Sequence, residues 1–497
     1  MTHIDINSAV PTNATLHSLP RRSQKQLLTA YWVATIALLL YEIYAPNTAS
    51  ILLNLVAVLV TSTALVSSYL WCAGKVHGLP IFPLFALTFI WTHALPLITA
   101  NPGVEVYSVD RRLFAGCTTA LFLALGTFIW FQFVKSVPPL PKAYRAFGDR
   151  EGTQFFLAAL AISTLFNVAN AGGWLPADPG VFAILRGIVL ALTALSAFVL
   201  AYRLGTQTLS KQQATLFVVL LVSFILSNAI GFLLVGAATV SLIAISAFII
   251  GRKKLPILMI VVMLLCLSLL HSGKGEMRAK YWFSLDRPTY VQPWEYPAIY
   301  VEWLGTSLKH FNPFDRAAKP PQGQSFLERS SVIQMLMLAQ EKSPYPIPYL
   351  YGKTYQILPE LLIPRILNPS KIRSHEGTFI LNIHYGRQTY KDTLITTIGW
   401  GLLAESYANF GWLGCAGLAV VLGAAYGQAT RWSINAPILS LQSLFAVILL
   451  TFAIQSEWSA GVYIAALAQY STVLIGLAFF LMKSCRVSTY LTHDNGA

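Results

Sequence analysis

The sequence YLYGKTYQILPELLIPRILNPSK occupies residues 349–371, and HEGTFILNIHYG (375–386) and TTIGWGLLAESYANFGWLGCAGLAVVLGAAYG (396–427) follow it. The first part gathers lysines and arginines among prolines, which rule out one long helix. The last part opens with polar residues, carries Glu405 on an expected helical turn, and continues as an apolar run that can cross a bilayer. This stretch therefore predicts a basic, irregular loop in water that leads into a membrane helix.

The composition of the whole chain is that of a membrane protein. Apolar residues make up 55% and charged residues 11% of its 497 positions, whereas about a quarter of the residues in a soluble protein are charged. The formal net charge of +14 could indicate a nucleic-acid partner. The basic residues, however, separate apolar runs instead of forming a stripe with interleaved aromatic residues, so we expect no nucleic acid.

The apolar runs predict an all-α polytopic membrane protein with about twelve transmembrane helices and one large extracytoplasmic loop that contains short helices. The predicted regions are a cytoplasmic tail (1–26), nine spans (27–271), the loop (272–407), three spans (408–482) and a second cytoplasmic tail (483–497). The expected spans are 27–44, 51–72, 79–99, 113–134, 154–170, 181–204, 214–229, 232–251, 255–271, 408–427, 437–455 and 460–482.

The distribution of basic residues predicts the orientation, because Lys and Arg accumulate in short cytoplasmic loops. With the N-terminus inside, sixteen basic residues fall in the tails and short loops on the cytoplasmic side. The short loops outside contain two, Arg111 and Arg112. We therefore expect a multi-pass protein of the cell (inner) membrane with an even number of spans and both termini in the cytoplasm.

The loop from Ser272 to Tyr407 is too long to lack structure of its own. Ser325 and Glu328 form an S-x-x-E capping box ahead of an apolar run, which predicts a helix over about 326–341. A second helix is expected over 298–310, where aromatic residues suit a position at the lipid headgroups. The five cysteines all lie within or beside apolar runs, so we expect small buried side chains and no metal site.

The order of several short motifs resembles that of the O-antigen polymerase (Wzy-type) family and its exopolysaccharide relatives. These motifs are YGKTY (351–355), LIPR (362–365) with Pro369 and Lys371 behind it, and AESYANFGWLG (404–414). Elsewhere only the hydropathy profile is similar. The R-x10-G spacing of some members is missing, because Gly377 lies one residue too far from Arg365. The resemblance implies a glycosyltransferase that polymerises undecaprenyl-diphosphate-linked oligosaccharide repeat units, of O-antigen or exopolysaccharide, on the outer face of the membrane.

The resemblance also implies that cationic residues of the loop contact the diphosphate. The developing charge of this leaving group must be neutralised, and the planar fork of Arg can pair with two phosphate oxygens. Arg365 is the first candidate, as a catalytic cation in its LIPR context, and Arg278 follows because it lies soon after a membrane exit. The further candidates for substrate binding are Arg329, Lys353, Lys371, Arg186 and His375. Each could instead meet lipid headgroups or solvent, and Arg186 could snorkel to the surface from inside its span.

Transfer of a glycan also requires a base that takes the proton from the attacking sugar hydroxyl. Glu405 is the first candidate, because an apolar span beside it can raise the proton affinity of a carboxylate. Its alternative role is to cap the helix that follows, which is common for an acid at a helix start. Glu376, His375 and His384 are the other candidates for the base.

The sequence contains no P-loop, HExxH, GxSxG or paired-aspartate motif. We therefore expect no metal and no cofactor, and a donor already energised as a lipid diphosphate. Two alternative functions stay open: an O-antigen ligase with a different acceptor, and a polysaccharide transporter or flippase without chemistry. The transporter predicts polar or broken helices at mid-membrane. The implied partners are the lipid-linked oligosaccharide, membrane lipids, and a separate flippase and chain-length regulator.

Overall fold

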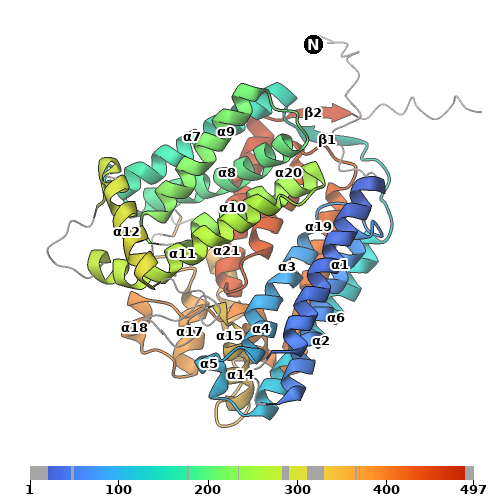
Figure 1. The fold of residues 1–497 in the computed structure, drawn as a ribbon, viewed down its shortest axis with the longest axis vertical. Helices are drawn as coiled ribbons and strands as arrows, with labels where there is room; N and C mark the ends of the chain where they lie inside the picture. Colours follow the sequence, from blue (N-terminus) through green and yellow to red (C-terminus); the bar gives the residue numbers. More distant parts are fainter. Residues whose placement is uncertain are drawn as a thin grey trace, which may run out of the picture.

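The computed structural model describes residues 21–45, 50–175, 178–232, 234–282, 290–310, 330–363, 367–368 and 370–486. Within these ranges eleven helices are long and apolar enough to cross a membrane (Figure 1). The chain is therefore an all-α multi-pass membrane protein, as its composition predicts. These helices are α1 (Arg21–Ile43), α2 (Ile51–Cys72), α3 (Ile81–Phe89) with its continuation through a π-helical turn (Ile90–Ala94) into α4 (Leu95–Ile98), α6 (Val109–Val134), α7 (Asp149–Ala171), α8 (Pro179–Gly205), α9 (Lys211–Ala229), α10 (Leu234–Arg252), α11 (Ile257–Trp282), α19 (Gly401–Ser433) and α21 (Ala460–Phe480).

The span predicted over 437–455 contains a helix that is shorter than a bilayer is thick. This helix, α20 (Leu441–Ala453), has 13 residues, or about 20 Å of helical rise, against a hydrocarbon core of about 30 Å. Most of its side chains are buried, which is typical of a short core helix. Flanking turns complete the crossing. Ser440 forms a β-bridge with Ala146 at one end, and Gly401 N donates to Glu457 O (3.2 Å) at the other.

Loops that were predicted to share one side of the membrane meet at one end of the bundle. β1 (Ala143–Ala146) follows α6, β2 (Lys483–Arg486) follows α21, and the two strands pair antiparallel (Figure 1). Arg203, in the last turn of α8, forms an ion pair with Asp149 at the start of α7 (2.6 Å). The chain therefore crosses the bundle an even number of times between these loops, as the charge pattern requires. Which end faces the cytoplasm stays a prediction.

A layer of short helices covers the opposite end of the bundle (Figure 1). We call the described residues from 290 to 400 the loop layer. Arg111, at the start of α6, donates to Gln340 O in this layer (3.2 Å), and Val332 N donates to Thr92 O (3.1 Å). The helices at this end are α5 (Pro102–Glu105), which precedes α6, and α12 (Tyr296–His310), α14 (Ile333–Lys342), α15 (Lys353–Gln356), α16 (Leu358–Leu362), α17 (Glu376–His384) and α18 (Tyr390–Ile395) of the loop layer.

Helix α12 confirms the helix predicted over 298–310. Ile299 and Trp303 are buried in a small apolar cluster with Phe232, whereas Leu304 is 40% exposed. Helix α14 covers the second part of the helix predicted over 326–341. Its predicted capping box, Ser325 with Glu328, lies outside the described residues.

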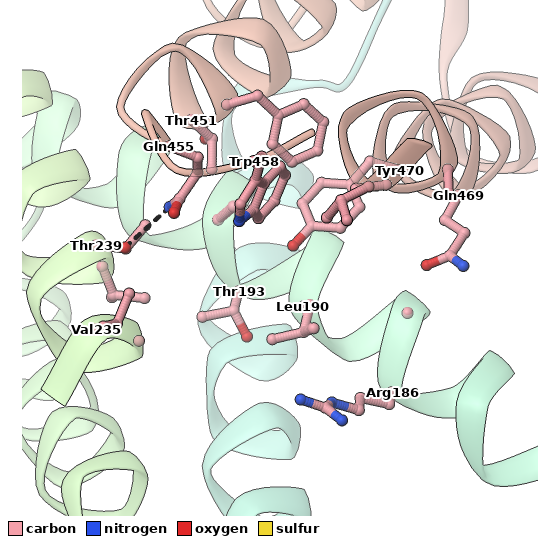
Figure 2. A pocket seen from close by; sticks show the side chains of 18 of the residues that line it. Arg186, Leu190, Thr193, Val235, Thr239, Thr451, Gln455, Trp458, Gln469 and Tyr470 are labelled. Carbon is pink, nitrogen blue, oxygen red and sulfur yellow. Dashed lines mark hydrogen bonds between the residues drawn. The ribbon is translucent and has the colours of Figure 1, made fainter. Parts of the chain in front are cut away.

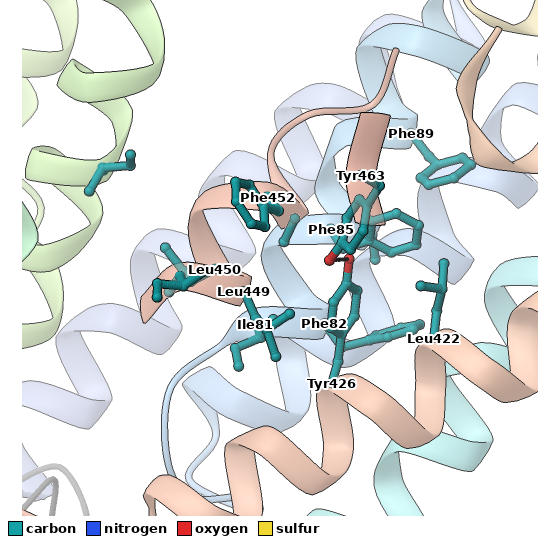
Figure 3. Close-up of a cluster of buried hydrophobic side chains, with 14 of the residues drawn as sticks. Ile81, Phe82, Phe85, Phe89, Leu422, Tyr426, Leu449, Leu450, Phe452 and Tyr463 are labelled. Atoms are coloured by element: carbon teal, nitrogen blue, oxygen red, sulfur yellow. Dashed lines mark hydrogen bonds between the residues drawn. The ribbon is translucent and has the colours of Figure 1, made fainter. Parts of the chain in front are cut away.

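Aromatic residues from α3, α6, α19 and α21 fill the bundle core (Figure 3). Phe82 of α3 stacks on Trp130 of α6 with ring centroids 5.8 Å apart, and the hydroxyl groups of Tyr426 and Tyr463 are 2.9 Å apart. Helices α6 and α19 approach so closely that a Cβ at Gly423 would lie 2.7 Å from the nearest backbone oxygen of α6. This packing fixes α21 against the first half of the bundle.

Helix α19 is broken at Gly411, where φ is 59° and ψ is −138°. The part after the break, 412–433, is about 33 Å long by helical rise and can cross a bilayer alone. The part before it, 401–410, carries Glu405 and leads out of the loop layer. The predicted span 408–427 therefore includes the break, which lies near the loop-layer end of the helix.

Candidate functional site

Two of the motifs that carry the family resemblance, YGKTY and AESYANFGWLG, lie against each other. Leu350 N donates to Ala408 O (3.0 Å), and Tyr351 N donates to Asn409 O (3.1 Å). The side chain of Asn409 accepts from Gly352 N (3.0 Å) and donates to Thr354 Oγ1 (2.8 Å). The YGKTY motif is thus bound along the end of the AESYANFG half-helix, which the separation of these motifs in sequence could not predict.

Two glycines make this approach possible. Gly411, at the break of α19, has a positive φ, and a Cβ on it would lie 2.8 Å from Tyr349 Oη. Gly352 also has a positive φ, of 89°, and a Cβ there would lie 3.1 Å from the ring of Phe410. Other residues would be strained in these conformations. The break in α19 is therefore part of the contact between the motifs.

Glu405 is fully buried at this contact, with 0% of its surface exposed. Its Oε2 accepts a hydrogen bond of 2.6 Å from Ala460 N, the first residue of α21. The N-cap residue of that helix, Ser459, makes no side-chain cap of its own and instead accepts from Thr378 Oγ1 (3.0 Å). Glu405 therefore caps α21, 55 residues downstream, whereas the sequence suggested capping of its own helix as the alternative to a catalytic role.

A cavity of about 540 Å³ lies among α8, α9, α10, α20 and α21 (Figure 2). Ser374 and His375 of the loop layer also line it. One part of its wall is apolar, with Leu190, Val235 and Phe452 among the lining residues. The polar residues on the wall are Arg186, Thr193, Asn228, Thr239, Ser374, His375, Thr451, Gln455, Trp458, Gln469 and Tyr470. The cavity therefore combines an apolar surface with a cation and a histidine.

Arg186 belongs to α8 and lines this cavity (Figure 2). It stands seven residues after Pro179, or about 10 Å into the helix by helical rise. Its side chain is exposed, and no hydrogen bond or ion pair joins its guanidinium to another described residue. A charge at this depth in a membrane helix is costly unless it faces water or a polar ligand. The five N–H donors of Arg186 are therefore open to an anionic group in the cavity.

His375 also lines this cavity, just before α17. The residue is exposed, but the protein around it reduces the hydration of its ring. This desolvation lowers the pKa of His375 below its ordinary value of 6.5. The imidazole is therefore neutral at pH 7 and can accept a proton.

Three other predicted site residues are described and are not among those that line the cavity. Arg278 donates from Nε and Nη2 to Phe232 O (3.1 and 2.8 Å) and stacks on Trp282 at 4.3 Å. Lys371 donates to Leu361 O. Lys353 is exposed on α15. Arg365 and Arg329 lie outside the described residues.

The two remaining candidates for the base also lie away from the cavity wall. His384 Nε2 is 2.9 Å from Pro348 O, and Glu376 forms the first turn of α17. The structure thus brings together two of the predicted residues, Arg186 and His375, from segments far apart in the sequence. Glu405, in α19, is not among the lining residues and instead contacts the start of α21.

Several polar residues of the cavity were not predicted. Gln455 Nε2 donates to Thr239 Oγ1 (3.0 Å), which joins the turn after α20 to α10 (Figure 2). Gln469 and Tyr470 face the cavity from α21, and Asn228 faces it from the end of α9. The available signal was the presence of Asn and Gln within apolar spans, where such side chains are expensive without a partner or water.

The described residues contain no group of three or more His, Cys, Asp or Glu side chains that could hold a metal ion. Comparison with known proteins gives no relative for this chain: no protein-family model, no curated protein and no solved structure matches it.

Proposed function

We propose that this protein is a membrane glycosyltransferase that polymerises oligosaccharide repeat units carried on undecaprenyl diphosphate. The observation that carries the proposal is the cavity at membrane depth that is lined both by Arg186, which has no bonded partner among the described residues, and by a neutral His375. This space adjoins a loop layer whose motifs resemble those of the O-antigen polymerase family. The reaction takes place on the outer face of the cell membrane, with a flippase and a chain-length regulator as partners.

Arg186 binds the diphosphate of the donor in this proposal. Its planar fork can form two parallel hydrogen bonds to phosphate oxygens, and these bonds strengthen as negative charge develops on the leaving group. The apolar part of the wall, which includes Leu190 and Val235, suits the first isoprene units of the carrier. Arg278, which is bonded to Phe232 O, is not among the residues that line this cavity.

His375 acts as the base. The hydroxyl at the non-reducing end of the acceptor attacks the anomeric carbon of the donor, and a new C–O bond forms. The bond from that carbon to the diphosphate oxygen breaks, and its electron pair leaves with the diphosphate. The hydroxyl proton passes to the imidazole of His375, which desolvation keeps neutral. Glu405 acts through α21 as a positioning residue, because it caps the helix that carries one wall of the cavity.

The direct test is extension of a purified lipid-linked repeat unit by the full-length protein in detergent. Arg186→Gln removes the charge and the fork, so product formation should fall by about thirtyfold, the equivalent of ~2 kcal/mol. Arg150→Gln removes an exposed arginine at the start of α7 and should leave the rate unchanged. Equal rates for both variants would exclude the cavity as the donor site.

A transporter without chemistry is the second candidate, because α19 is broken at Gly411 and a π-helical turn interrupts the span that contains α3. Broken helices often form the binding sites of transporters. The break in α19, however, lies near the loop-layer end, and 412–433 crosses the bilayer without it. The extension assay separates the two functions, since a transporter leaves the lipid-linked unit chemically unchanged.

A further inference from the structure

A separate groove runs between α1 and the start of α11. Its volume is about 570 Å³. The residues that line it are Lys25, Gln26, Thr29, Ala30, Val33, Ala34, Ala37, Leu255 and Ile257. It shares no lining residue with the cavity of Arg186 and His375, and it lies toward the end of the bundle that carries β1 and β2.

The groove forms because one face of α1 packs on α2 while the neighbouring face carries small side chains. One face packs on α2, where Tyr31 Oη donates to Leu65 O (3.2 Å) and Thr61 Oγ1 donates to Glu42 Oε1 (2.5 Å). The neighbouring face carries alanines at 30, 34 and 37, whose small side chains leave the hollow. Leu255 and Ile257 close it from the other side, and Ile257 is 68% exposed. The groove therefore opens to the lipid that surrounds the bundle.

The length of the groove and its charge fit one leaflet of a bilayer. From Lys25 to Ala37 the groove follows α1 for about 18 Å of helical rise, while one leaflet contributes about 15 Å of hydrocarbon. Lys25 is exposed at the end where the headgroups of that leaflet would lie. Lys25 is the cationic residue that lines the groove, and the basic run Arg252–Lys254 directly precedes Leu255 of its other wall in the sequence.

We propose that this groove binds one anionic phospholipid, with an acyl chain between α1 and α11 and its phosphate at Lys25, near Arg252–Lys254. Apolar area along the helices would hold the chain, and the lysines would select a negative headgroup over a zwitterionic one. With the predicted orientation the site faces the cytoplasmic leaflet. The proposal does not depend on the glycosyltransferase function.

Native mass spectrometry of the full-length protein in mild detergent tests the site, with phosphatidylglycerol and phosphatidylcholine of equal chain length as probes. The wild-type protein should retain one phosphatidylglycerol more tightly than phosphatidylcholine. Lys25→Gln should weaken binding of phosphatidylglycerol by about fivefold, as expected for one lysine near a membrane surface. Lys211→Gln, at an exposed lysine that begins α9, should leave this affinity unchanged.

A second pair of variants tests the groove itself. Ala30→Leu with Ala34→Leu fills the hollow and should abolish the retained lipid, whereas Ala416→Leu adds the same side chain at an exposed alanine of α19 and should not. All variants are compared at matched monodispersity, and a variant that misfolds is replaced by Ala37→Leu. Equal retention of the two lipids by the wild-type protein would overturn the proposal. So would retention of phosphatidylglycerol that is unaffected by filling the groove.

Discussion

Arg186 and Glu405 are both ionisable residues near the loop-layer end of membrane helices, but their surroundings differ. Glu405 is fully buried and one of its oxygens is bonded to the N-terminus of α21, whereas Arg186 is exposed to a cavity and has no bonded partner among the described residues. A carboxyl group bonded to the protein's own backbone serves the fold, and a charge left open at membrane depth is available to a ligand. We therefore propose binding for Arg186 and positioning for Glu405.

The largest effect is expected at His375, on the same cavity wall as Arg186. His375→Gln retains a polar side chain of similar size but cannot act as the base, so turnover should drop by about a hundredfold or more. Binding of the lipid-linked unit should persist. The measurement is single-turnover extension together with a binding assay. His384→Gln, at a histidine bonded to Pro348 O, is the control, and a larger loss there than at His375 would move the base to His384.

A conservative change at Arg186 separates the effect of its charge from that of its planar fork. Arg186→Lys keeps the positive charge but loses the bidentate fork. The value of kcat/KM should therefore fall by about tenfold, between the wild-type protein and Arg186→Gln. Steady-state kinetics with varied lipid-linked donor would measure it. A value equal to that of the wild type would mean that only the charge matters at this position.

The pH dependence should follow the protonation of His375. Its pKa lies below 6.5 because desolvation disfavours the imidazolium, so the neutral, active form predominates above pH 6.5 and is lost as the pH falls through the lowered pKa. The rate should then fall by about tenfold per pH unit. A pH profile of kcat/KM tests this limb. If the limb persists unchanged in His375→Gln, another group is responsible for it.

The smallest effect on the reaction is expected at Glu405. Glu405→Gln keeps a carbonyl oxygen for Ala460 N, so the change should cost no more than about 1 kcal/mol of stability. The rate should change by no more than a few-fold. Thermal unfolding and the extension assay measure the two quantities. A hundredfold loss of turnover with intact stability would instead make Glu405 the base, as the sequence alone suggested.

The sequence predicted the bounds of a helix well where the apolar run itself sets them. The predicted span 51–72 has the bounds of α2, Ile51–Cys72, because polar residues and glycine end the apolar run. The sequence failed at α20 and at the break of α19. There the surrounding helices, not the hydropathy of the segment, decide how much of the chain is helical.

The candidate site could be predicted only in part, because its contacts are distant in sequence. Arg186 and His375 were identified one at a time from charge and context, but their shared cavity depends on the packing of α8 against α21. The partner of Glu405 is a backbone N–H at Ala460. Every residue except proline has this group, so the sequence could not identify it as the partner. Charge and motif order thus indicated candidate residues, while the division of their roles required coordinates.

Photocrosslinking of the donor to the cavity tests the central claim most directly. A benzophenone amino acid would replace Leu190, which lines the cavity beside Arg186, and, as the matched control, Val421, a 62% exposed residue on the outside of α19. With labelled undecaprenyl-diphosphate-linked repeat unit, we predict strong crosslinking at position 190 that Arg186→Gln reduces, and only background crosslinking at position 421. Equal labelling at the two positions, or labelling at 190 that does not depend on Arg186, would contradict the assignment of this cavity as the donor site.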